Sequence, residues 1–175
     1  ITATPSPVIT PQRSALFDYT RAVRMLEVEE YKDAIASFGI VIRVLPDFAL
    51  AYHGRALAYY HEELYSLALD DFDKAIEINP DLADTYHARA QTAANRGDFQ
   101  SALADLDTAM QLSPENGGYF LDRAVIYQIL GEFDLSAADF ATAKDLGAGG
   151  NLGLDQHANS ETVIHLISTD TRSLS

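Results

Sequence analysis

Three of the five histidines are spaced so that they could bind a metal ion together. His53 and His87 lie 34 residues apart, and His61 follows His53 by eight. On neighbouring helices, two or three imidazoles could therefore face the same open surface, as transition-metal sites require. No Asp or Glu lies at ligand spacing with them, cysteine is absent, and His157 and His165 are far away in the sequence. Polar contacts with a bound peptide are the favoured interpretation and a metal site is the alternative. We predict no resident metal and no cofactor.

The other reactive side chains do not form a recognisable catalytic set. Carboxylates are abundant, but clusters such as Asp70, Asp71 and Asp73 are expected on solvated outer faces of helices. No serine has a plausible His and Asp pair, and no glycine-rich phosphate loop follows a strand. We therefore predict that the protein is not an enzyme, and enzymatic activity is the least favoured alternative.

The net charge and the composition limit the classes of molecule that the protein is expected to bind. The net charge of −14 and the pI near 4.5 disfavour nucleic acids and anionic lipid surfaces, because the field of the protein would repel both. No apolar run approaches the ~20 residues of a membrane span. With 175 residues, of which 47% are hydrophobic, the chain can build one ordinary core.

The elements that would position these residues repeat every 34 residues. The recurring positions are Pro46, Pro80 and Pro114; Arg21, Arg55, Arg89 and Arg123, each followed by Ala; and Phe38, Phe72, Leu106 and Phe140. Small residues recur at Ala34, Ala68 and Ala102, with Ser136 in the fourth copy. A repeat of this length predicts stacked copies of one supersecondary unit.

This pattern of a small residue, an aromatic, Ala, Phe and a closing Pro resembles the tetratricopeptide repeat. The resemblance implies an all-α fold, a right-handed superhelical solenoid of four helix-turn-helix repeats at 15–48, 49–82, 83–116 and 117–150. We expect helix pairs at 15–28 with 31–44, 49–62 with 65–78, 83–95 with 99–112, and 117–130 with 133–146. Ser14 is the expected N-cap of the first helix. Gly97 and Gly131 suit a positive φ in the turn within a repeat, whereas Glu29 and Glu63 predict a strained or different turn there.

The segments outside the repeats have a different composition. Residues 1–14 are rich in Pro, Thr and Ser and predict an extended, non-helical tail. Candidate O-glycosylation sites in this tail are Thr2, Thr4, Ser6 and Thr10. Residues 151–175 predict a glycine-rich linker, a capping helix at 161–168, with a strand as the alternative, and a polar tail. The absence of an initial Met predicts either an expressed cytoplasmic fragment or, as we favour, an exported mature chain that is extracellular or periplasmic.

The resemblance also places the first helix of each repeat on a concave, peptide-binding face. The predicted groove residues are Tyr19, Val23, Leu26, Leu50, His53, Leu57, Tyr60, His61, His87, Gln91, Leu121, Val125 and Gln128. If the helical register is off by one residue, some of these side chains belong to the core instead. Chaperone-binding members of the family hold a terminal carboxylate with Lys, Asn and Arg side chains. The matching positions here carry Tyr19, Val23, Gly54, Asp84 and Ala88, so this clamp is missing.

The repeated arginines are predicted to be structural. Asp residues recur just before the large apolar position, and pairing within one repeat leaves only Arg21 without a carboxylate, because Ser37 replaces its Asp. The predicted ion pairs are Arg55 with Asp71, Arg89 with Asp105, and Arg123 with Asp139.

These observations predict a non-enzymatic protein-interaction scaffold. The favoured hypothesis is head-to-tail self-assembly into an extracellular fibre. In it the tail of one copy, anchored by Ile1, Val8 and Ile9, lies in the groove of the next, because thirteen residues in polyproline geometry span about 40 Å. The alternative is an exported or lipid-anchored periplasmic adaptor that binds a segment of a different protein.

Overall fold

The computed structural model describes residues 11–148, and these form helices without any strand. The helices are α1 (Pro11–Glu27), α2 (Tyr31–Val44), α3 (Ala49–His61), α4 (Tyr65–Ile78), α5 (Ala83–Asn95), α6 (Phe99–Leu112), α7 (Gly117–Leu130) and α8 (Phe133–Asp145). Their number, their order and the all-helical fold agree with the four predicted helix pairs. The predicted tail anchors, glycosylation sites and capping helix lie outside the described residues.

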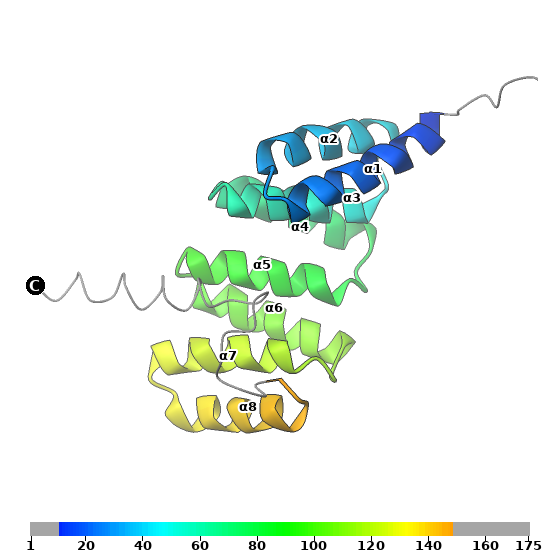
Figure 1. Ribbon diagram of the computed structural model, residues 1–175. Helices are drawn as coiled ribbons and strands as arrows, with labels where there is room; N and C mark the ends of the chain where they lie inside the picture. The colour runs from blue at the N-terminus through cyan, green and yellow to red at the C-terminus, as the bar shows by residue number, and fades with distance from the viewer. Residues whose placement is uncertain (1–10, 149–175) are drawn as a thin grey trace, which may run out of the picture. The chain divides into compact units, whose positions relative to one another are not determined.

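The chain divides into two compact units, each made of two helix pairs (Figure 1). Unit 1, Ile1–Pro80, contains α1 to α4, and unit 2, Asp81–Ser175, contains α5 to α8. In unit 1 the core gathers around Phe38 and Val41 of α2, both fully buried. In unit 2 it gathers around Leu106 of α6 together with Tyr119 and Ile126 of α7.

Small residues at the repeated positions bring the two helices of each pair together. Ala22, Ala34, Ala56, Ala68, Ala90, Ala102 and Ala124 are at most 1% exposed, and Ser136 is 4% exposed. Short side chains at a crossing let helix axes approach closely, and the larger residues then fill the space beside the crossing. In unit 1, Gly54 of α3 permits an even closer contact, because a Cβ at this position would lie only 2.3 Å from the ring of Phe38.

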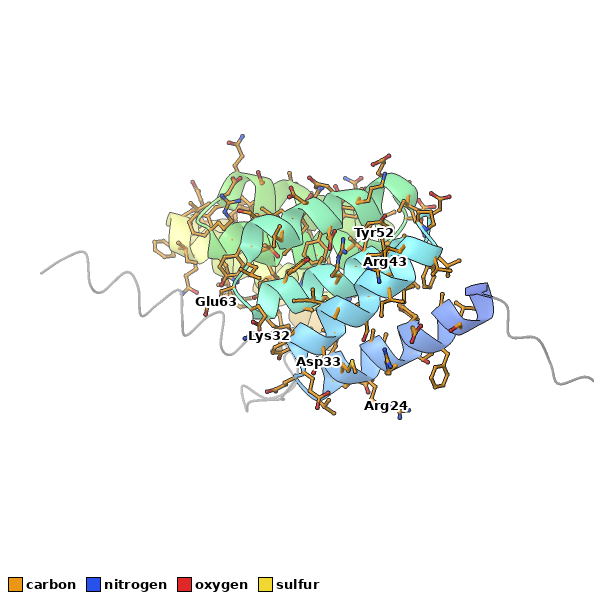
Figure 2. The ribbon with its side chains drawn as sticks, turned by 90° about the horizontal axis from the view of Figure 1, so that it is seen from above. Arg24, Lys32, Asp33, Arg43, Tyr52 and Glu63 are labelled. Carbon is orange, nitrogen blue, oxygen red and sulfur yellow. The ribbon has the colours of Figure 1, made fainter. Side chains whose placement is uncertain are left out.

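The turn inside each repeat has one backbone conformation in all four copies. Positions 29, 63, 97 and 131 all have φ between 59° and 80°. The residue that follows each of them donates its N–H to a carbonyl five positions earlier, at 2.8–2.9 Å. Glycine adopts this left-handed conformation freely, but Glu29 and Glu63 (the latter labelled in Figure 2) do so at a cost. The prediction of strained turns in the first two copies is therefore confirmed.

Four helix ends differ from the predicted ones. Helix α1 begins at Pro11 rather than after Ser14, so the expectation that residues 1–14 form no helix is wrong for the last of them. Proline is tolerated in the first turn of a helix, where its missing N–H would have no partner. Helices α1, α3 and α8 each end one residue early, at Glu27, His61 and Asp145. Within residues 11–148, no helix combines the length and the apolar character that crossing a bilayer requires.

Candidate functional site

The predicted groove residues of unit 1 lie on α1 and α3, and none of them is buried. Leu50 is 40% exposed, while Leu57 and Tyr60 are partly exposed. Three other predicted groove residues, all on α1, also contribute to the core. Tyr19, Val23 and Leu26 pack partly against the buried cluster, so the alternative of a core role holds in part for α1. We call Leu50, Leu57 and Tyr60, together with Leu16 on α1, which is 51% exposed, the unit 1 surface.

Tyr19 illustrates this double role. Its ring meets the ring of Phe38 at 5.9 Å and that of Phe48 at 4.9 Å, both in edge-on geometry. The surrounding apolar side chains desolvate the phenol, which raises the pKa of Tyr19 above its ordinary value. Substituting Tyr19 would therefore disturb the fold as well as the surface.

The two unit 1 histidines sit among aromatic rings. His61 stacks on Tyr31 with centroids 4.6 Å apart and planes 3° from parallel, and it meets Tyr60 edge-on at 5.3 Å. His53 lies 5.8 Å from the ring of Phe72. Over the described part of the chain, no group of three His, Cys, Asp or Glu side chains is arranged to hold a metal ion.

In unit 2, polar side chains of α5 and α7 form a hydrogen-bond network. His87 Nε2 lies 2.6 Å from Asp122 Oδ2, and Gln91 Nε2 donates to the same oxygen at 2.9 Å. The Tyr119 hydroxyl donates to Asp84 Oδ1 at 2.7 Å, and its ring lies 4.8 Å from that of His87. We call Asp84, His87, Gln91, Tyr119 and Asp122 the unit 2 network.

This network is partly open to solvent. The side chains of His87 and Asp122 are 22% and 20% exposed, and Asp84 is exposed. Burial of the Tyr119 phenol raises its pKa far above the ordinary value, and the hydrogen bond to Asp84 raises it further. The phenol therefore stays protonated and keeps donating to Asp84 across the physiological pH range.

The remaining predicted groove residues lie on α7. Leu121 and Val125 are partly exposed, and Gln128 is exposed.

Tyr119 and Asp122 were absent from the predicted site. Of the three groove residues predicted on α7, Leu121 is the one that lies 34 positions after His87. The observed contacts join residues 35 apart, His87 with Asp122 and Asp84 with Tyr119. Equivalent residues of stacked repeats are therefore not the ones that touch, and adding one residue to the repeat spacing would have found both partners.

The positions of the missing carboxylate clamp are occupied by groups unsuited to an acidic peptide. Gly54 faces the Phe38 ring without room for a side chain, and Ala88 is 6% exposed. Asp84 adds a negative charge at another of these positions and already accepts a hydrogen bond from Tyr119. A ligand's terminal carboxylate would meet repulsion here instead of a cation.

Three of the four repeated arginines pair with the predicted carboxylate of their own repeat, and Arg123 Nη1 also donates to Asp107 Oδ1 of the preceding repeat at 2.6 Å. Each of three guanidinium groups forms two hydrogen bonds of 2.6–2.8 Å with one carboxylate: Arg55 with Asp71, Arg89 with Asp105, and Arg123 with Asp139. The carboxylates are buried, which corrects the expectation of an outer-face position for Asp71. The hydrogen bonds that the guanidinium groups donate to these carboxylates raise the pKa of Arg55 and of Arg123.

Aromatic rings complete these pairs, and the first repeat departs from the pattern. Arg55 lies 5.8 Å from the ring centroids of both Tyr52 and Tyr59, a cation–π arrangement.

Arg21 was expected to lack a carboxylate, and this is wrong. Its Nη2 lies 3.5 Å from Asp18, one helical turn earlier, and 3.4 Å from Ser37 Oγ.

Comparison with known proteins identifies the repeat. Two sequence models of the tetratricopeptide repeat match residues 49–82 and 72–104. No curated protein matches the chain by sequence.

Solved structures share the fold at low sequence identity. A crystal structure of MamA is 18% identical with a TM-score of 0.72, and the match covers 76% of this chain and 78% of MamA. MamA from Desulfovibrio magneticus RS-1, residues 41 to the end, is 16% identical with a TM-score of 0.71, covering 82% and 79%. The first tetratricopeptide domain of Spaghetti (RPAP3), bound to the HSP90 peptide SRMEEVD, is 19% identical with a TM-score of 0.67, covering 71% and 99%. The sequence models and the fold agree that the chain contains tetratricopeptide repeats, and the eight helices of residues 11–148 are consistent with four of them.

Proposed function

We propose that this chain is a non-enzymatic interaction scaffold that binds an extended protein segment on the first helices of its repeats, and that the segment is the N-terminal stretch of another copy. The observation that carries the proposal is the exposure of the unit 1 surface. Leu16 and Leu50 are 51% and 40% exposed although both lie on helices that build the core. Apolar side chains gathered on one open face are typical of a protein-binding surface.

The chemistry of the surface favours an uncharged or basic segment. The whole chain has a net charge of −14, but residues 1–13 contain no Asp or Glu and one Arg. Within that stretch Ile1, Val8 and Ile9 provide apolar side chains that suit the leucines of the unit 1 surface. An extended segment rich in proline also has carbonyl groups without hydrogen-bond partners, which amide and imidazole donors can satisfy.

The comparison structures support a peptide ligand without identifying it. The Spaghetti domain holds a peptide that ends in Glu-Glu-Val-Asp. Here the clamp positions carry no cation and Asp84 adds a negative charge. The proposed ligand is therefore held by apolar contacts and hydrogen bonds, in contrast to an acidic chaperone tail.

Self-assembly is tested by the mass of the protein in solution. Sedimentation velocity of the full chain should show species larger than a monomer that grow with concentration. Deleting residues 1–10, which leaves α1 intact, should reduce them to monomers with unchanged far-UV circular dichroism. Full-length protein that stays monomeric at high concentration contradicts self-assembly.

A substituted surface tests where the segment binds. Leu50→Asp combined with Leu57→Asp should prevent assembly, because both carboxylates would face an apolar segment. Leu67→Asp is the matched control, since Leu67 lies on α4 of the same unit and is 46% exposed. Equal loss of assembly in the control would show a general charge effect and contradict the assignment.

The unit 2 network favours a second candidate, an adaptor that binds a polar segment of a different protein. Its Asp84 and Asp122 carboxylates suit a segment carrying Lys or Arg. A monomeric full-length chain that binds lysine-containing peptides, with binding reduced by Asp84→Asn, would favour this candidate over self-assembly.

A further inference from the structure

Helix α1 exposes a stripe of side chains that is basic in the middle and apolar at both ends. Phe17 is 71% exposed, and Val28, the residue after α1, is 58% exposed. Arg21 and Arg24 lie between them, and both are exposed. The spacing of four, three and four residues places all four on one face of the helix. Val28 continues the helical geometry, because its N–H donates to Arg24 O at 3.2 Å. We call Phe17, Arg21, Arg24 and Val28 the α1 stripe.

The α1 stripe departs from the repeat pattern. In the second repeat the positions of Phe17 and Arg24 carry Ala51 and Ala58, which are fully buried in the core of unit 1. Phe and Arg are much larger than Ala, and Arg is charged. A further repeat placed before α1 in the usual register would therefore overlap with these two side chains. The α1 stripe is thus a different surface from the one that a repeat presents to its neighbour.

The two arginines of the stripe can accept a carboxylate from a partner. The Arg21 side chain is 48% exposed, and its ion pair with Asp18 is long, at 3.5 Å. Arg24 takes part in no ion pair within residues 11–148, and Figure 2 shows it on the outer side of α1, away from α2. In a chain with a net charge of −14, two exposed arginines on one face form a local surface that attracts acidic groups.

A second copy of the chain does not complement the α1 stripe. Two α1 helices packed antiparallel would place Arg21 of each copy opposite Arg24 of the other, which is repulsive. A helix that complements the stripe needs two acidic residues three positions apart. Within residues 11–148, Asp70 and Asp73 are the pair that meets this condition on one helix. The positions four residues outside this pair carry Ser66 and Glu77, where apolar side chains are needed.

An anionic bilayer also fits the stripe less well than a helix does. Glu27, Glu29 and Glu30 are exposed beside the Val28 end of the stripe. A flat anionic surface would approach these carboxylates together with the arginines and would be repelled. A helix about 10 Å wide can lie along the stripe alone. Residues 1–10 contain no Asp or Glu, so they cannot neutralise the arginines.

We propose that the α1 stripe binds an acidic amphipathic helix of a different protein. The complementary helix carries two carboxylates three positions apart, with one apolar residue four positions before the first and another four positions after the second. This spacing is the same in both directions and therefore fits a parallel or an antiparallel helix. The inference goes beyond the proposed function, because Leu16 of the unit 1 surface lies about 100° around α1 from Phe17.

Fluorescence anisotropy with synthetic peptides tests the chemistry of the partner. The probe is a labelled alanine-based helical peptide with Leu at the two apolar positions and Glu at the two acidic ones, and its control carries Lys in place of both Glu. The full chain should bind the Glu peptide saturably and about ten-fold more tightly than the Lys peptide, with a difference that shrinks as salt is added. Absence of binding, or equal binding of the two peptides, would overturn the proposal. Binding to phosphatidylglycerol vesicles but not to the Glu peptide would assign the stripe to a membrane and overturn it as well.

A charge reversal tests whether the stripe is the binding surface. Arg24→Glu should weaken binding of the Glu peptide about ten-fold, because one attractive contact becomes repulsive. Arg43→Glu is the matched control, since Arg43 is an exposed arginine on α2 of the same unit. It should change the affinity by less than about two-fold, because solvent and salt screen a charge that does not touch the peptide. Equal losses in the two variants would show a general charge effect and contradict the assigned surface.

Tryptophan fluorescence reports on the stripe itself, because the chain contains no Trp. In Phe17→Trp the emission of the full chain should lie at long wavelength, as for an indole in water, and should shift to shorter wavelength when the Glu peptide is added. An unchanged emission on saturation with the peptide would place the peptide elsewhere. Short-wavelength emission of the protein alone would show that the chain or another copy already covers the stripe. Either result would overturn the proposal.

Discussion

Replacing Arg89 by Met should strongly destabilise unit 2, because it leaves a buried carboxylate without its cation. Arg89 donates to both oxygens of Asp105 at 2.8 and 2.7 Å, and the Asp105 side chain is only 10% exposed. Removing one partner of a fully buried pair costs about 3–5 kcal/mol. The Arg89 side chain is 24% exposed, so water can partly solvate the remaining carboxylate. We therefore expect a loss of about 2–4 kcal/mol, which corresponds to a fall in Tm of about 4–16 °C.

The first repeat supplies a matched control for this variant. Arg21 has the same repeat position, but its side chain is 48% exposed and its carboxylate partner is Asp18, at 3.5 Å on the same helix. Arg21→Met should therefore cost less than about 1 kcal/mol. Both variants should be compared by urea unfolding followed by far-UV circular dichroism. Replacing both members of the pair, Arg89→Met with Asp105→Leu, should recover most of the loss. Equal, small effects of Arg89→Met and Arg21→Met would refute the reasoning.

Three further predictions concern the turns, a helix crossing and a cap. Glu63→Gly should raise stability by up to about 1 kcal/mol in urea unfolding, because residue 63 has a φ of 59°, and Gly97→Ala should lower it by a similar amount, since φ there is 79°. Gly54→Ala should cost about 1–3 kcal/mol because its Cβ would lie 2.3 Å from the Phe38 ring, and Phe38→Leu in the same chain should recover part of that loss. Hydrogen bonds from the Ser101 hydroxyl and backbone N–H lower the pKa of Asp98, so this cap stabilises the fold above the ordinary pKa of Asp and stops doing so as pH falls through the lowered value. Ser101→Ala should raise that pKa toward its ordinary value in an NMR titration, and an unchanged titration would count against the cap.

The fold could be predicted because each repeated residue type has one structural role. Alanines at the crossings, prolines after the second helices, and arginines 34 positions apart set the helix pairs and the ion pairs together. The turns could be predicted for the same reason, since glycine at positions 97 and 131 indicates a backbone that Glu29 and Glu63 also adopt.

The binding residues were harder to predict, because contacts between repeats do not follow the repeat spacing. Tyr119 and Asp122 face partners 35 residues earlier, so comparing equivalent positions misses them. Asp18 escaped notice as the partner of Arg21 because that contact lies within one helix and has no counterpart in the later repeats. A contact that occurs in only one repeat cannot be found from a periodic sequence pattern.

Binding of the isolated N-terminal segment tests the central claim most directly. A fluorescently labelled peptide of residues 1–13 should bind saturably, by fluorescence anisotropy, to the chain lacking residues 1–10. Binding should be lost with Leu50→Asp and Leu57→Asp and kept with Leu67→Asp. No binding, or binding that survives the paired substitution in the unit 1 surface, would contradict the account.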